Sequence, residues 1–260
     1  MCLYRCLNTR LEGRAVFLLA LVITGAIVFI MTKSYSVNQD PLSLHIKQVL
    51  QPLVPLEELT NITFVGRGQD DPALVAYIRK HELFPPSDLP YNLTQPDRKD
   101  FSQYRQSTYA EENFLHGMRG GFFLEAGALD GEDKSNSLYF EKYKGWTGLL
   151  VEPTPSLFRH LSTLHRKAYS INAAFSLSNV SATATFVEAR GLGRIREGTK
   201  HGFTIRTFPF YSMLLALGVT QIDFFTLDIE GHEQIVSTRD ITSLRALCTN
   251  ADGVCIRQQT

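Results

Sequence analysis

The sequence has no surplus of charge of either sign and few cysteines, and each shortage excludes a class of protein. Its 260 residues include 26 Lys plus Arg and 26 Asp plus Glu, so neither a nucleic-acid-binding surface nor an acidic disordered chain is indicated. The four cysteines form no CxxC pair or Cys/His cluster, which argues against a metal site. Internal repeats and low-complexity tracts are also absent from the sequence. The hydrophobic content of 44% instead fits a globular domain with a buried sheet.

One long apolar run lies near the N-terminus, at residues 15–31, and it contains no charged residue. As a helix it would span roughly 26 Å, close to the apolar thickness of a bilayer. Arg5, Arg10 and Arg14 precede this run, whereas a single lysine follows it closely. By the positive-inside rule, this asymmetry predicts a single-pass type II signal anchor with residues 1–14 in the cytosol. A cleaved signal peptide is the alternative, but the run is longer than a usual signal sequence.

Features of the remaining chain agree with a location in the lumen of the secretory pathway. Three N-glycosylation sequons follow the apolar run, at Asn61, Asn92 and Asn179. Cys248 and Cys255 lie on the same predicted side of the membrane, where an oxidising compartment would allow them to form a disulfide. Cys2 and Cys6 lie on the cytosolic side and are either palmitoylation sites or idle thiols.

Prolines dominate the stretch after the anchor, and we interpret residues 32–100 as a lumenal stem that leads into a domain at residues 101–260. One helix is predicted within the stem, at residues 71–79. Its N-cap would be Asp71, with Pro72 as the first helical residue.

Short apolar strands alternate with helical patterns in the second half of the chain. The predicted strands are residues 121–125, 147–152, 170–175 and 222–228. The predicted helices are residues 109–118, 135–144, 155–165 and 211–217. This alternation is typical of an α/β fold with a parallel sheet covered by helices on both faces. Ligands of such sheets bind at the carboxyl ends of the strands.

Acidic side chains and glycines follow three of the predicted strands. Glu125 ends the first strand and is followed by the glycine-containing turn 126–131. Glu152 ends the second strand, where a carboxylate can accept hydrogen bonds from ribose hydroxyls or can simply be an exposed acid. Residues 228–233 (DIEGHE) end the fourth strand and are either a functional cluster or the start of a solvated helix.

These motifs together resemble the FkbM family of S-adenosylmethionine-dependent methyltransferases. The stretches that carry the resemblance are GGFFLEAGALDGEDKSN, GWTGLLVEP, NAAF and IDFFTLDIEGHE, and they lie between residues 101 and 235. The resemblance implies a Rossmann-like methyltransferase fold. The wider pattern, which adds the N-terminal anchor and DPALVAYIR, is similar to the Star group of secretory-pathway membrane proteins.

The family resemblance also implies roles for individual residues. The implied cofactor is S-adenosylmethionine, with contacts from Glu125, Gly127, Ala128, Asp130, Gly131, Glu152 and Asp228. The implied catalytic residues are Asp228, Glu230 and His232. Of these, His232 is a candidate base because the unperturbed pKa of histidine is near neutral.

The sequence departs from the family pattern after the fourth strand. Only 27 residues follow Glu233, and they contain at most one short strand, at residues 253–256. We therefore expect a C-terminally truncated sheet in which residues 222–228 form an exposed edge strand.

Three functions remain open from the sequence. The first is a Star-like membrane protein that aids vesicle transport of membrane-bound cargo between the endoplasmic reticulum, the Golgi, endosomes or the plasma membrane. The second is an O-methyltransferase that uses S-adenosylmethionine. The third is an inactive truncated isoform. Retained acids at the strand ends favour the second, whereas the predicted anchor favours the first, because an enzyme in the lumen would need its cofactor to be transported there. We favour the first function, with the methyltransferase-like fold as its scaffold, since a fold alone does not determine function.

Overall fold

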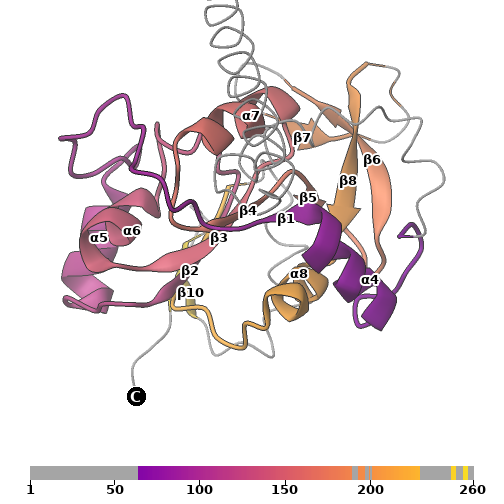
Figure 1. The fold of residues 1–260 in the computed structure, drawn as a ribbon, viewed down its shortest axis with the longest axis horizontal. Helices are drawn as coiled ribbons and strands as arrows, with labels where there is room; N and C mark the ends of the chain where they lie inside the picture. The colour runs from indigo at the N-terminus through magenta and orange to yellow at the C-terminus, as the bar shows by residue number, and fades with distance from the viewer. Residues whose placement is uncertain are drawn as a thin grey trace, which may run out of the picture. The chain divides into compact units, whose positions relative to one another are not determined.

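Two β-sheets form the framework of the protein in a computed structural model (Figure 1). The structure describes residues 64–188, 193–196, 199, 201–228, 247–249 and 254–256, the last two segments as backbone only. The predicted anchor at residues 15–31 and the site residues Asn61, Glu230 and His232 lie outside the described residues.

The larger sheet has the strand order β1-β4-β3-β2-β9-β11-β10. Its strands are β1 (Leu83–Phe84), β2 (Phe122–Ala126), β3 (Thr147–Val151), β4 (Tyr169–Ile171), β9 (Phe224–Leu227), β10 (Leu247–Thr249) and β11 (Val254–Ile256). The four central strands β4, β3, β2 and β9 run parallel, whereas β1 pairs antiparallel with β4, and β11 antiparallel with β9 and β10. The sheet is therefore mixed, with a parallel centre.

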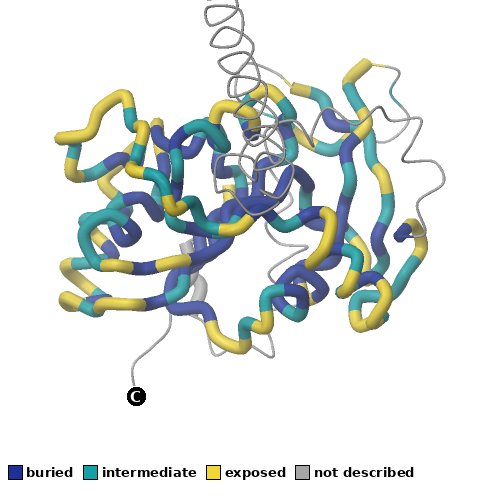
Figure 2. The backbone as a smooth tube through the Cα atoms, in the orientation of Figure 1, coloured by how far each residue is buried: buried dark blue, intermediate teal, exposed yellow. Residues whose placement is uncertain are grey.

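Helices cover both faces of this sheet because its central strands are apolar on both faces. On one face, Phe123 and Leu150 pack in a cluster with Phe140 of α6 (Leu138–Lys144). On the other, Leu124 packs in a cluster with residues of α4 (Pro72–Tyr77) and α8 (Phe210–Leu217). Figure 1 shows α5 (Gln106–Ala110) beside α6 on one side and α4 near α8 on the other. The tube in Figure 2 is accordingly dark blue along the central strands.

The remaining helical segments are two π-helical turns, which continue α4 and α5, and helix α7, which follows β3. A π-helical turn continues α4 over Ile78–Glu82, and another continues α5 over Glu111–Leu115. Helix α7 (Pro155–Thr163) follows β3 and begins with a proline, whose fixed φ suits the first turn of a helix.

The smaller sheet was not predicted from the sequence. Its order is β5-β8-β6-β7, with β5 (Ala174–Phe175), β6 (Ala182–Val187), β7 (Arg194–Ile195) and β8 (Phe203–Phe208). It departs from the larger sheet after β4, because Ile171 ends one strand and Ala174 begins the other. The single strand predicted at residues 170–175 is thus two strands in two sheets.

The predicted fold class needs correction in three respects. The mixed α/β architecture is consistent with a methyltransferase-like fold, but the sheet is not purely parallel. The expected edge strand is also wrong, because β11 pairs with β9 through Val254 and Thr226. Finally, the predicted class included a transmembrane helix, and none of the helices in the described part of the chain is long and apolar enough to cross a bilayer.

The described part of the predicted stem packs against the domain. Phe64, Leu74 and Ile78 are each at most 1% exposed and belong to the core cluster beneath α8. The predicted start of the helix is confirmed, since the Asp71 carboxylate accepts a hydrogen bond from Ala73 N at 2.8 Å and Pro72 is the first helical residue. Residues of the predicted stem therefore share a hydrophobic core with the domain, although the boundary between the two was expected at residues 100–101.

Candidate functional site

A cavity of about 180 Å³ lies where the strand order of the larger sheet reverses. From β2 the sheet extends in one direction through β3 to β4. The chain then returns, and β9 pairs with the opposite edge of β2. Ligands of parallel sheets bind at such a reversal, beyond the carboxyl ends of the strands. The lining includes residues from the ends of β2, β3 and β9, namely Ala126, Gly127, Val151, Glu152 and Asp228.

Glu152 is the most constrained acid of this cavity. Its side chain is 2% exposed, and its two carboxylate oxygens accept hydrogen bonds from Leu129 N (2.8 Å) and Thr154 N (2.7 Å). Burial raises the pKa of Glu152 to about 7, and the carboxylate of Glu188 adds to this rise. The two backbone donors fix the orientation of a carboxylate that lines the cavity, so it is preorganised to accept hydrogen bonds from a ligand.

The smaller sheet supplies apolar residues to the lining of the same cavity. Phe175 of β5, Phe186 of β6 and Ile195 of β7 line the cavity, as does Leu177. These residues were missed from the sequence because the smaller sheet was missed. The segment 182–187 (ATATFV) has β-branched residues at every second position, Thr183, Thr185 and Val187, and this is the signal that would have predicted a strand.

Gly127 and Asp228 lie in close backbone contact at the reversal of strand order. Gly127 has φ +81°, and a Cβ added there would lie 2.1 Å from the carbonyl oxygen of Asp228. Asp228 N also donates to Ala126 O at 3.0 Å. The missing side chain of Gly127 thus lets the end of β9 approach the end of β2, and both residues line the cavity.

Two non-glycine residues in the loop after β2 adopt left-handed backbone conformations. Leu129 has φ +52° and Lys134 has φ +64°, and both line the cavity. Such conformations cost energy in residues with a side chain and cluster at functional sites. Their location supports the assignment of this cavity as the functional site.

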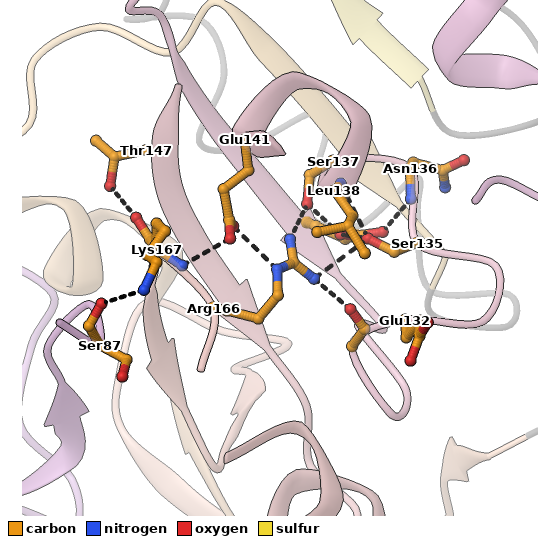
Figure 3. A network of polar contacts seen from close by, with 12 residues as sticks. Ser87, Glu132, Ser135, Asn136, Ser137, Leu138, Glu141, Thr147, Arg166 and Lys167 are labelled. Carbon is orange, nitrogen blue, oxygen red and sulfur yellow. Dashed lines mark hydrogen bonds and ion pairs between the residues drawn. The ribbon is translucent and has the colours of Figure 1, made fainter. Parts of the chain in front are cut away.

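Glu125 is held by a buried network of hydrogen bonds, and Figure 3 shows the part of this network around Arg166. Its carboxylate accepts hydrogen bonds from Ser135 Oγ, Ser137 Oγ and Asn136 N. Arg166 donates to both of these serines and forms an ion pair with Glu141 at 3.0 Å. Burial raises the pKa of Glu125, and the charge of Arg166 opposes that rise. The carboxylate of Glu125 therefore anchors the loop 135–137.

Three other predicted cofactor contacts are not part of the cavity lining described here. Ala128 is 2% exposed and packs in a core cluster. Asp130 accepts hydrogen bonds from the backbone of Glu132 and Asp133. Gly131 has φ +85°, and a Cβ there would lie 2.8 Å from Leu161 Cγ, so this glycine serves the packing of α7 against the loop.

The remaining predicted residues have the following positions. Asp228 is exposed at the end of β9, whereas Glu230 and His232 are outside the described residues. The sequon residues Asn92 and Asn179 are exposed. Cys248 of β10 is directly opposite Cys255 of β11 in the strand register, so the two backbones are neighbours, and the disulfide stays a prediction.

A second, much smaller cavity of about 20 Å³ adjoins the first. The two share six lining residues: Gln103, Ala126, Gly127, Leu129, Lys134 and Asp228. The smaller cavity adds Gln106, Glu125, Asn136 and Thr226.

Comparison with known proteins gives one family match. Residues 125–236 match the family model described as the methyltransferase FkbM domain. This range includes Glu152, Thr226 and Asp228. No curated protein and no solved structure matches the chain. The resemblance to the FkbM family is confirmed over these residues, whereas no comparison supports the finer resemblance to the Star group.

Proposed function

We propose that the domain binds S-adenosylmethionine in the larger cavity and transfers its methyl group to an oxygen of an acceptor molecule. The match of residues 125–236 to the methyltransferase FkbM domain supports a methyltransferase-like function, and this family typically uses S-adenosylmethionine. The observation that carries the proposal is Glu152, a buried carboxylate that two backbone N–H groups orient at the end of β3.

The residues of the cavity fit the two ends of an adenosine group. Glu152 offers acceptor oxygens for the ribose hydroxyls, in the position that such acids occupy in nucleotide-binding sheets. Phe175, Phe186 and Ile195 offer apolar surface for a flat, aromatic base. The fit thus rests on the acceptor oxygens and the apolar side chains of the cavity lining. The cofactor would supply the electrophilic methyl group when bound.

The contribution of the protein in this proposal is mainly positioning. Gly127 lets the ends of β2 and β9 converge, which brings the exposed carboxylate Asp228 to the same cavity as Glu152. Asp228 is the predicted catalytic residue that the structure describes, and in this proposal it accepts the proton of the acceptor hydroxyl. Holding both reactants in one geometry accounts for the largest part of the expected rate enhancement. Transport of membrane-bound cargo stays a prediction from resemblance.

Calorimetric titration of the full chain with S-adenosylmethionine tests the proposal. The wild type is expected to bind saturably, and Glu152→Ala is expected to lose most of that affinity because the ribose acceptors are removed. Asp133→Ala is the matched control, since it removes an acid whose side chain is 60% exposed, in the same loop region but outside the cavity lining. Absence of binding by a folded wild-type chain, or equal affinity in Glu152→Ala, would refute the proposal.

A further inference from the structure

The last two strands of the larger sheet form a short antiparallel hairpin. β10 and β11 have three residues each, and residues 250–253 connect them. On its other side β11 pairs with β9, and β10 is the last of the described strands in the order of this sheet. In the described part of the chain, the hairpin is therefore joined to the sheet through the pairing of β11 with β9.

Two cysteines occupy the central position of this hairpin. Its three register pairs are Leu247 with Ile256, Cys248 with Cys255, and Thr249 with Val254. Directly opposed residues of an antiparallel pair have Cα atoms about 4.5–5.5 Å apart. A disulfide needs a Cα separation of about 4.4–6.8 Å. The register therefore meets the distance condition for a disulfide, which the sequence alone could not establish.

The strand that this hairpin covers is apolar and buried. Phe224, Phe225 and Leu227 of β9 are at most 3% exposed, and Phe225 is the register partner of Cys255. Loss of the hairpin would open this edge of β9, and an open edge of an apolar strand can pair with other chains. A hairpin of two short strands is marginally stable by itself. An additional constraint on the hairpin would thus protect β9.

We propose that Cys248 and Cys255 form a cross-strand disulfide that holds the β10–β11 hairpin on β9. The bond joins the central register pair, so it limits the conformations that the hairpin can adopt when its strands separate. Restricting the open state favours the paired state. The inference goes beyond the proposed function, because the disulfide needs neither a cofactor nor a methyl acceptor.

Thiol–disulfide exchange accounts for formation of the bond. The thiolate of one cysteine attacks a disulfide oxidant such as oxidised glutathione, which gives a mixed disulfide and releases one reduced glutathione. The thiolate of the second cysteine then displaces the remaining glutathione. The two cysteines lose two protons and two electrons in total, and the oxidant receives them as two thiols. The register favours the second step, because it holds the two residues at opposed positions.

Peptide mass spectrometry of the full chain tests whether the bond forms. Both cysteines lie in one tryptic peptide, residues 246–257, because Arg245 and Arg257 mark its ends. The protein is equilibrated in glutathione buffers of increasing oxidised share, and free thiols are then blocked with iodoacetamide. The expected product is the single peptide without alkyl groups or glutathione. Alkylated or glutathione-bearing peptide at every ratio, or a cross-linked peptide dimer, would overturn the proposal.

A variant with a shifted cysteine tests the dependence on register. Cys248→Ser/Thr249→Cys moves one thiol by one position, and successive residues of a strand lie on opposite faces of the sheet. It also shortens the intervening loop, so an unstructured chain would oxidise the variant at least as readily as the wild type. In the folded state, the wild type is expected to reach half oxidation with about tenfold less oxidised glutathione.

The same measurement in urea provides the control for folding. The advantage of the wild-type pair should disappear there, and the wild type should itself need more oxidised glutathione than in its folded state. Equal midpoints for the two proteins without urea, or a wild-type midpoint that urea leaves unchanged, would mean that the register does not direct the pairing.

Hydrogen exchange of the full chain tests whether the bond holds the hairpin on β9. The backbone amides of residues 224–227 and 254–256 are expected to exchange about tenfold more slowly in the oxidised than in the reduced protein. Cys248→Ser should abolish this difference, whereas Cys6→Ser, which removes a thiol distant in sequence, should retain it. Exchange rates that are independent of oxidation would reject the proposed role. Neither measurement involves S-adenosylmethionine, so the outcome is independent of the proposed function.

Discussion

Arg166 and Glu141 form an ion pair of 3.0 Å whose side chains are 2% and 0% exposed. Arg166 also donates to the carbonyl of Gly131 and to the hydroxyls of Ser135 and Ser137. One guanidinium therefore connects α6 with the loop that follows β2 (Figure 3). Its planar set of donors suits this task, whereas a lysine has a single nitrogen.

Arg166→Met is expected to destabilise the protein by about 3–5 kcal/mol, because it leaves the Glu141 carboxylate buried without its cation. Urea denaturation of the full chain measures the difference. Arg67→Met is the matched control, since Arg67 pairs with Asp71 at 2.9 Å with both side chains about 30% exposed, and such a pair contributes about 1 kcal/mol or less. Equal effects of the two substitutions would contradict a structural role for the buried pair.

Gly127→Ala is expected to disrupt the end of β9 and weaken S-adenosylmethionine binding. The new methyl group would meet Asp228 O at 2.1 Å, so the backbone of one strand must move. Gly145→Ala is the control, because Gly145 also has positive φ (+68°) but a Cβ there meets nothing within 4 Å. The control should cost about 1–2 kcal/mol from backbone strain alone.

Thermal unfolding and nucleoside titration of both variants check this prediction. The difference between Gly127→Ala and Gly145→Ala isolates the contact with Asp228. If Gly127→Ala were no less stable than the control and bound the cofactor equally well, the close approach of β2 and β9 would not matter for the site.

The sequence predicted the elements that lie on local patterns and missed those that depend on distant pairing. Strands β2, β3 and β9 are continuous apolar runs, and each was predicted within two residues of its ends. The smaller sheet joins β5 to β8 across about 30 residues, so no local pattern reveals it. The short strand predicted at residues 253–256 is present as β11, whereas its pairing with β9, which corrects the expected edge strand, was not predicted.

For the site, too, the sequence predicted what depends on local patterns and missed what depends on distant contacts. Glu152 and Asp228 line the cavity, as expected for acids at strand ends. The roles of Glu125 and Gly131 depend on Arg166 and Leu161, which are distant in sequence, and pattern reasoning had no means to identify those partners. The motif thus placed two acids at the cavity, whereas tertiary contacts decide which of the other predicted residues line it.

Thr226→Val is expected to leave stability unchanged or raise it by up to about 1 kcal/mol, because a buried hydroxyl that lacks a partner among the described residues is replaced by a methyl group. Thr207→Val is the matched control, as the buried Thr207 hydroxyl donates to Ala182 O at 3.2 Å and its loss should cost about 1 kcal/mol. Urea midpoints of the full chain measure both. A Thr226→Val protein that is destabilised as much as the control would show that the hydroxyl has a structural partner.

Glu152 should make both stability and cofactor binding depend on pH. Its folded pKa of about 7 lies above the usual glutamate value of 4.5, so the folded protein binds more protons than the unfolded chain between these values. The stabilisation from the protonated carboxyl is complete below pH 4.5 and is lost as pH rises through 7, by about 3 kcal/mol. Glu152→Gln stays neutral but loses one of the two backbone hydrogen bonds, so the variant is expected to start less stable than the wild type and to gain stability relative to it as pH rises from 5 to 8. Urea denaturation across this range checks the sign, with Asp133→Asn as the exposed control.

Binding of the cofactor is expected to release a proton from the carboxyl group of Glu152. Ribose hydroxyls donate to a carboxylate more strongly than to a neutral acid, so the bound cofactor favours the ionised form of Glu152 and lowers its pKa. S-adenosylmethionine affinity should rise between pH 6 and 8, and titrations in two buffers of different ionisation enthalpy should detect proton release near pH 6.5. Glu152→Gln should abolish this release while Asp133→Asn retains it. Proton uptake, or release that persists in Glu152→Gln, would mean that another group titrates and that Glu152 does not receive the ribose hydroxyls.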